Sequence, residues 1–91
     1  MKRIHLFVSG KVQGVWFRAR TEDRAKELCL TGWVKNLDDG RVEVVAEGEE
    51  DILKKLIEFC KIGSSESRVD NLEIKWEKFK GEFDQFKALF L

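Results

Sequence analysis

Residues 33–47 read WVKNLDDGRVEVVAE, and this stretch has the pattern of a β-hairpin at the centre of the chain. Two strand-like runs, Trp33 to Leu37 and Arg41 to Glu47, flank the turn-forming sequence Asp38-Asp39-Gly40. In the second run, every other residue is apolar, which indicates one buried face made by Val42, Val44 and Ala46. The hairpin predicts a β-sheet, and the rest of that sheet must come from the residues on either side.

The residues before the hairpin predict a strand followed by a helix. Residues 4–9, IHLFVS, alternate with a period of two and therefore indicate a strand. From residue 15 or 17 to residue 30 the apolar positions follow a helical period, and Gly32 is a stop signal. A helix that starts at Thr21-Glu22-Asp23 is an alternative, because this sequence is also typical of a capped N-terminus.

The residues after the hairpin predict a helix followed by two strands. Acidic residues 49–51 open a second helix, where they suit the positive end of the helix dipole. Apolar residues at positions i, i+3, i+4 and i+7 between 53 and 60 give this helix one buried face, and it ends near Gly63. Alternation at residues 72–76 predicts a fourth strand, and the apolar stretch 83–89 predicts a short last strand.

The order strand, helix, strand, strand, helix, strand is that of the split βαβ, or ferredoxin-like, fold. We therefore expect an α+β protein in which two helices cover one face of an antiparallel sheet, as a single domain over residues 1–91. In this topology the first and second strands run parallel with another strand between them. The loop after Ser9 and residue Asn36 should then lie within about 10 Å of each other, which is two strand spacings.

Composition limits the classes of partner. Lysine and arginine number 17 and so do aspartate and glutamate, so the net charge gives no general attraction to nucleic acid or to an acidic membrane. Neither a signal peptide nor an apolar run of about 18 residues is present in the sequence. We expect a cytoplasmic monomer in which Cys29 and Cys60 are reduced thiols on the apolar sides of the two helices.

The loop between the first strand and the first helix has the features of an anion site. Residues 10–18 read GKVQGVWFR, and its glycines allow main-chain N–H groups to approach a ligand closely. If the helix starts near residue 15, the N–H groups of residues 13–18 point outward at its positive end, and Arg18 adds a planar fork of donors. The sequence is not a nucleotide-binding P-loop, because the Gly-Lys-Ser/Thr ending is missing. The only histidine, His5, lies in a predicted strand, and no carboxylate and histidine cluster has the spacing of metal ligands, so we expect no catalytic metal.

Taken alone, these residues leave simpler roles open. An arginine such as Arg18 is more often a solvated helix residue, and Asn36 precedes a turn, where asparagine is common for conformational reasons. The glycines could serve only to turn the chain.

Two segments together resemble the signature segments of the acylphosphatase family. They are GKVQGVWFR at residues 10–18, followed by Thr21, and GWVKN at 32–36 with DGRVEVVAEG at 39–48. The resemblance covers nearly the whole chain and implies hydrolysis of acyl phosphates to a carboxylate and inorganic phosphate, on a ferredoxin-like fold without a cofactor. It also implies that Arg18 binds the phosphate and Asn36 orients the attacking water. The phosphate loop would then consist of Gln13, Gly14, Val15, Trp16 and Phe17, with Trp16 as a possible wall of the pocket and Thr21 bonded to a main-chain carbonyl in support.

Hydrolysis of an acyl phosphate can proceed with an arginine, main-chain N–H groups and an oriented water as the only catalytic groups. The leaving group is a carboxylate, a weak base that needs no general acid, and the loose transition state mainly requires charge stabilisation and an in-line nucleophile. The sequence departs from the family pattern at Gly63-Ser64-Ser65, where many members have a proline. We therefore expect a less rigid loop there.

Two other functions fit the same fold. A ferredoxin-like module that binds RNA would need paired aromatic residues and a basic sheet face, and the strands at 4–8 and 42–45 provide neither. A domain at the front of a larger carbamoyl-transferring maturation protein is the second alternative, and a chain of 91 residues argues against it.

Overall fold

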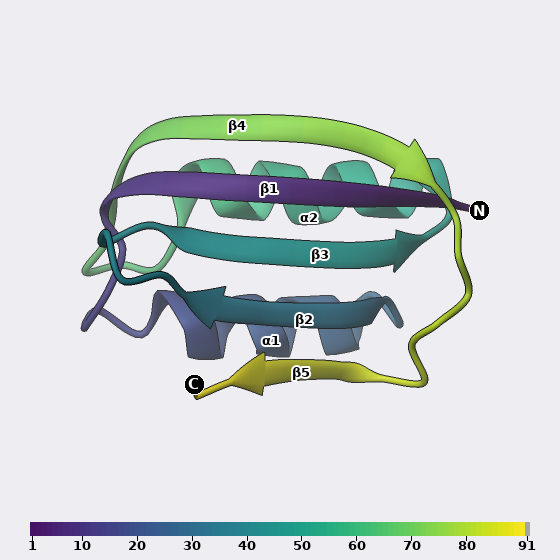
Figure 1. Ribbon diagram of the computed structural model, residues 1–91. Helices are drawn as coiled ribbons and strands as arrows, with labels where there is room; N and C mark the ends of the chain where they lie inside the picture. Colours follow the sequence, from purple (N-terminus) through teal and green to yellow (C-terminus); the bar gives the residue numbers. More distant parts are fainter. Residues whose placement is uncertain (91) are drawn as a thin grey trace.

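A computed structural model describes residues 1–90 of the chain as a five-stranded sheet with two helices. In chain order the elements are β1 (Lys2–Lys11), α1 (Phe17–Glu27), β2 (Thr31–Asn36), β3 (Val42–Gly48), α2 (Glu50–Ile62), β4 (Arg68–Lys78) and β5 (Phe86–Leu89). The predicted ferredoxin-like fold is confirmed, with both helices on one face of the sheet (Figure 1).

The strand order is β4-β1-β3-β2-β5. β3 pairs antiparallel with both β1 and β2, so β1 and β2 run in the same direction as predicted. β5 differs from the expected antiparallel pattern, because it pairs parallel with β2, which makes the sheet mixed. The C-terminal ends of β1, β2 and β5 consequently lie at the same end of the sheet (Figure 1).

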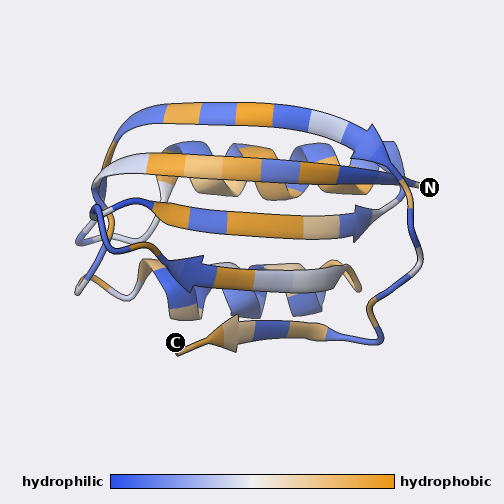
Figure 2. Ribbon diagram, in the orientation of Figure 1, coloured by the Kyte–Doolittle hydropathy of each residue, from blue (hydrophilic) through white to orange (hydrophobic). Residues whose placement is uncertain are grey.

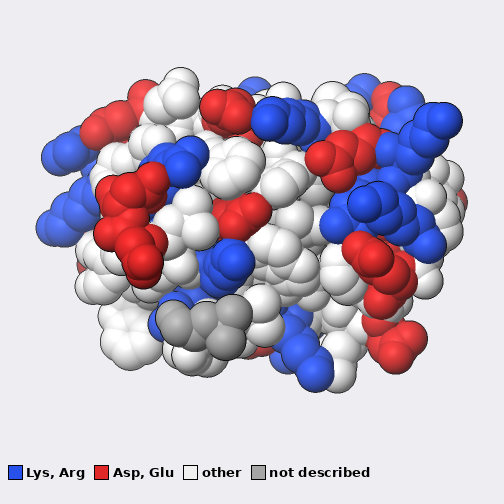
Figure 3. Space-filling view, viewed as in Figure 1, with Lys and Arg blue, Asp and Glu red and all other residues white. Residues whose placement is uncertain are grey.

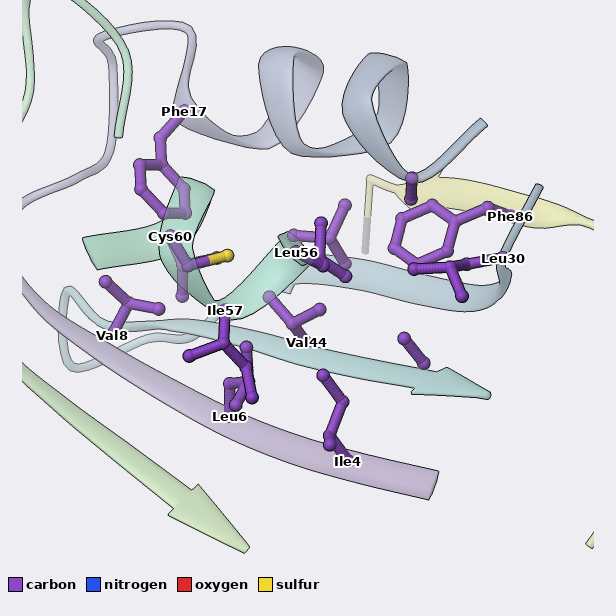
Figure 4. Close-up of a cluster of buried hydrophobic side chains, with 14 of the residues drawn as sticks. Ile4, Leu6, Val8, Phe17, Leu30, Val44, Leu56, Ile57, Cys60 and Phe86 are labelled. Carbon is purple, nitrogen blue, oxygen red and sulfur yellow. The ribbon is translucent and has the colours of Figure 1, made fainter. Parts of the chain in front are cut away.

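The hydrophobic core lies between the sheet and the two helices (Figure 4). Alternate residues of β1 point into it and are fully buried, and β4 shows the same alternation of polar and apolar residues (Figure 2). The predicted apolar face of α2 is also buried, and each fully buried leucine or isoleucine contributes about 1.5–3 kcal/mol to folding. The buried residues of these two elements are Ile4, Leu6, Val8, Leu53, Leu56, Ile57 and Cys60.

The first helix is shorter than its sequence pattern indicated. α1 begins at Phe17, one of the two starts expected, and ends at Glu27, three residues before Leu30. The alternative start at Thr21 is wrong: Thr21 is buried inside the helix, where its hydroxyl donates a 2.8 Å hydrogen bond to the carbonyl of Phe17. Cys29 lies beyond the helix end with φ of 57° and is exposed, so its assignment to the core is also wrong.

Gly32 does not stop α1, which has ended five residues earlier; it lies inside β2. Its φ is +142°, and a Cβ atom at this position would collide with the main-chain carbonyl oxygen of Val45 on the neighbouring strand. The glycine is therefore required for close packing of β2 on β3. In the sequence, a glycine with this role cannot be distinguished from one that ends a helix.

The connection from β4 to β5 crosses from one edge of the sheet to the other (Figure 1). The Glu47 carboxylate, 2% exposed, accepts hydrogen bonds from the main-chain N–H groups of Lys80 at 2.8 Å and Gly81 at 3.2 Å. Arg3 donates to the same carboxylate at 3.4 Å and to Glu82 at 2.6 Å. These contacts fix the path of the crossover and so the place where β5 begins.

A pair of glycine substitutions tests the packing of β2 on β3. We expect Gly32→Ala to lower the free energy of unfolding by about 3 kcal/mol or more, because the backbone is strained and the new methyl group meets a rigid carbonyl. Gly40→Ala is the matched control: Gly40 also has a positive φ, +97°, but a Cβ atom there meets nothing within 4 Å. It should lower the free energy of unfolding by about 1 kcal/mol from backbone strain alone. Urea unfolding followed by circular dichroism measures both, and equal losses would contradict this account.

The two cysteines should differ in reactivity. Burial raises the pKa of the Cys60 thiol to about 12, so at pH 8 its thiolate is on the order of one part in ten thousand. Cys29 is exposed. We expect Ellman's reagent at pH 8 to titrate one thiol rapidly in the native protein and two after denaturation, and Cys29→Ser to remove the rapid reaction. Two rapid thiols in the native wild type would show that Cys60 is accessible.

Candidate active site

The loop between β1 and α1 is fixed by three buried side chains. Val12, Val15 and Phe17 are 1%, 6% and 1% exposed, whereas Gly14 and Trp16 between them are exposed. Gly14 and Trp16 both have positive φ values, 72° and 66°. Such left-handed residues turn successive main-chain N–H groups toward one side, which forms a concave site for an anion.

Main-chain carbonyls of this loop point into the protein. The carbonyl of Val15 accepts a 2.6 Å hydrogen bond from the hydroxyl of buried Ser64, and that of Trp16 accepts one of 2.9 Å from the N–H of Arg20. Ser64 belongs to the segment where the family's proline is missing, and its hydroxyl ties that segment to the loop. Within residues 1–90, the N–H groups of 13–18 donate no hydrogen bond to the protein. These N–H groups lie at the positive end of α1, where a negative charge is favoured.

Gln13 connects the loop to the neighbouring hairpin. Its side-chain Nε2 donates hydrogen bonds to the carbonyls of Leu37 at 2.7 Å and Arg41 at 2.9 Å. These carbonyls flank the turn between β2 and β3, so the Gln13 side chain fixes the loop against the end of β2. The side chain thus has a supporting position, and Gln13 lies outside the residues that line the pocket described next.

One pocket brings the predicted catalytic residues together. Its volume is about 280 Å³, and Arg18 from α1 and Asn36 at the end of β2 both line it. The other lining residues are Val12, Gly14, Trp16, Phe17, Ala19 and Phe90. Val15 lies outside this lining set, and its side chain, like the ring of Phe17, is buried.

Asn36 has an unusual feature for a polar residue at a strand end. Its side-chain oxygen Oδ1 is buried but accepts no hydrogen bond from residues 1–90. Buried polar atoms in proteins almost always have a partner, and each exception calls for an explanation such as a bound ligand or water. The pocket provides the space for that partner.

The Arg18 side chain is half-buried beside the C-terminal strand. Its Nη1 donates a long hydrogen bond of 3.3 Å to the carbonyl of Leu89, and its Cζ lies 3.9 Å from the centre of the Phe90 ring. The ring covers a face of the guanidinium, while the donors in its plane that Leu89 does not use remain open to an anion.

Sequence reasoning missed Phe90, Leu89 and Ser64 as parts of this site. The apolar stretch 83–89 predicted a strand but gave no indication of its partner, and the parallel pairing with β2 is what brings residues 89 and 90 to Arg18. The long connection before this stretch is the one sequence signal for these residues, because a strand that follows such a connection can pair with either edge of the sheet.

Charges of both signs and the Phe7 ring, with Arg41 beside it, lie on the open face of the sheet. Acidic and basic side chains are interspersed over it (Figure 3), and His5 and Lys35 pair there with Glu43 at 2.5 Å and 3.8 Å. His5 is thus a strand residue in contact with a carboxylate of the neighbouring strand, and it lies outside the pocket lining. No helix among residues 1–90 is long and apolar enough to cross a membrane.

Comparisons with known proteins show the family to which the chain is similar. The Acylphosphatase family model matches residues 4–88. A curated acylphosphatase from Methylococcus capsulatus is 48% identical over 89 residues, which is 98% of this chain and 97% of the relative.

Solved structures show the same similarity. The crystal structure of acylphosphatase from Bacillus subtilis is 38% identical with a TM-score of 0.95, covering 99% of this chain and all of that one. The structure of HypF from T. kodakarensis is 34% identical with a TM-score of 0.81, but the match covers only 12% of that much longer chain. Since both the sequence and the structure match acylphosphatases over their whole length, the chain belongs to the acylphosphatase family, whose members hydrolyse the carboxyl-phosphate bond of acyl phosphates.

Proposed function

We propose that the acylphosphatase activity of this chain resides in the pocket between the loop 12–16 and the end of β2. The main-chain N–H groups of the loop and Arg18 bind the phosphate of the substrate, and Asn36 orients the water that attacks it. The observation that carries the proposal is the buried, unpartnered Oδ1 of Asn36, which lines the same pocket as Arg18 and the outward-facing N–H groups. The proposed substrate-binding residues are Gln13, Gly14, Val15, Trp16 and Phe17.

The phosphate has two kinds of partner in this arrangement. The loop N–H groups are fixed by buried anchors before the substrate arrives, so no reorganisation opposes binding or the reaction. The guanidinium of Arg18 is planar and permanently charged, and its parallel N–H groups match two phosphate oxygens. Together these groups stabilise negative charge on the equatorial oxygens of the transition state.

Asn36 acts on the nucleophile. Its Oδ1 accepts a hydrogen bond from a water molecule and fixes the water in line with the bond that breaks. A bond forms between the water oxygen and phosphorus while the bond between phosphorus and the carboxyl oxygen breaks. The electron pair of the broken bond leaves with the carboxylate, and the water proton passes to a phosphate oxygen. A carboxamide is not a base, so the contribution of Asn36 is position rather than proton transfer.

We propose that the reaction needs neither a metal nor another cofactor, since Arg18 and the main-chain N–H groups supply the positive charge. We also propose one domain over residues 1–91, acting as a cytoplasmic monomer. The continuous five-stranded sheet, the family match over residues 4–88, the two free cysteines and the zero net charge support this view.

Substitution of Arg18 tests the phosphate site. The wild type should hydrolyse benzoyl phosphate in the presence of EDTA, and Arg18→Ala should lower kcat/KM roughly a thousandfold, as for other arginines that act on phosphoryl groups. Arg24→Ala, on the same helix but outside the pocket lining, is the control and should keep wild-type activity. A loss of less than tenfold for Arg18→Ala would place the phosphate elsewhere, and dependence of the wild type on added metal would refute the cofactor proposal.

Substitution of Asn36 separates the reaction from binding. We expect Asn36→Ala to lower kcat at least about a hundredfold while the inhibition constant of inorganic phosphate changes less than threefold, because water position matters to the transition state and not to the product. Asn71→Ala, an exposed asparagine on β4, is the control. Steady-state kinetics with phosphate as a competitive inhibitor measures both quantities. A parallel loss of turnover and phosphate binding would show that Asn36 binds the phosphate instead of the water.

A further inference from the structure

Two exposed aromatic side chains line the pocket. Trp16 is 68% exposed and Phe90 is 76% exposed, yet both belong to the lining that also includes Arg18 and Asn36. The phosphate of a substrate uses the polar part of this pocket, so its acyl group must extend toward the exposed residues. Trp16 and Phe90 provide large apolar surfaces there.

Phe90 can contact an acyl group while Arg18 binds the phosphate. The ring covers one face of the guanidinium, with the Arg18 Cζ 3.9 Å from the ring centre. Phosphate oxygens approach an arginine in the plane of its N–H groups, not through its face. Binding of phosphate therefore leaves the ring in place, and the ring edge and its free face remain available to an apolar group next to the phosphate.

The end of β5 is fixed close to Phe90. Phe86 is 1% exposed and pairs with Gly32 of β2. Two residues before Phe90, the N–H of Ala88 donates a 2.6 Å hydrogen bond to the carboxylate of Glu22 on α1. This contact joins β5 to α1, the helix that carries Arg18, and so places the end of β5 beside Arg18.

Trp16 is fixed by its backbone. As the N-cap of α1 it has φ of 66° and ψ of 11°, a left-handed conformation that is costly for a bulky residue. Strain of this kind persists where the surrounding structure enforces it, and it is concentrated at functional sites. The buried neighbours Val15 and Phe17 enforce it here, and the result is that the indole lies at the pocket instead of in the core.

We propose that Trp16 and Phe90 form a binding site for the acyl group and that the enzyme prefers flat, apolar acyl groups, such as aromatic ones, over an acetyl group. This inference rests on the proposed function. Stacking or edge contact of an aromatic acyl group with each side chain strengthens binding of the substrate and the transition state, and a methyl group is too small to contact both. The pocket volume of about 280 Å³ suits a small substrate of this kind.

The test compares kcat/KM for benzoyl phosphate and acetyl phosphate in the wild type and in Phe90→Ala and Trp16→Ala. The wild type should prefer benzoyl phosphate, and each substitution should lower the ratio of the two kcat/KM values about three- to tenfold. Phe90→Leu, which keeps an apolar side chain, should retain more of the ratio. Phe79→Ala is the matched control, an exposed aromatic residue in a different pocket, and should leave the ratio unchanged.

An equal loss with both substrates would overturn the inference, because Phe90 would then act only on Arg18. An unchanged ratio in both alanine variants would overturn it too. Inhibition by benzylphosphonate and by methylphosphonate gives an independent readout without turnover: the ratio of their inhibition constants should change in the same direction and by a similar factor. Failure of the wild type to hydrolyse either acyl phosphate would instead refute the proposed function.

Discussion

The site depends on main-chain N–H groups that the fold leaves without internal partners. Residues 13–16 precede α1 and residues 17 and 18 lie in its first turn, where the helix offers no carbonyl to their N–H groups; the first bond of the helix runs from the N–H of Arg20 to the carbonyl of the N-cap Trp16. An N–H group that loses water without gaining a partner costs about 1–3 kcal/mol. In the proposed function an anion supplies these partners, and the packing of Val12, Val15 and Phe17 fixes the loop that carries the N–H groups.

Strand direction determines which other groups reach this anion site. β1, β2 and β5 run parallel, so the loop after β1, Asn36 at the end of β2 and Phe90 after β5 meet at one end of the sheet (Figure 1). Three segments that are far apart in the sequence thus contribute the proposed phosphate loop, the residue proposed to orient water and the Phe90 ring.

Elements that neighbouring residues determine could be predicted from the sequence. Residues whose position depends on tertiary contacts could not. Alternation and turn residues identified the hairpin, and helical periodicity identified α2, because those signals come from neighbouring residues. Gly32 was misread as a helix stop, since close approach of β3 also requires a glycine and the sequence does not distinguish the two causes. Cys29 was misplaced because the last turn expected for α1 was never formed. Phe90 was missed because its position depends on the edge that β5 joins.

The edge that β5 joins is determined at the opposite end of the sheet from the pocket. The crossover after β4 is bonded to the buried carboxylate of Glu47, which accepts two main-chain N–H groups and pairs with Arg3. Removing such a charge from water is costly, and its partners roughly compensate for that cost, so the cluster contributes more to geometry than to net stability. Its effect is to select one path for residues 79–85. That path places β5 on β2, and the pairing of β5 with β2 places the Leu89 carbonyl and the Phe90 ring against Arg18.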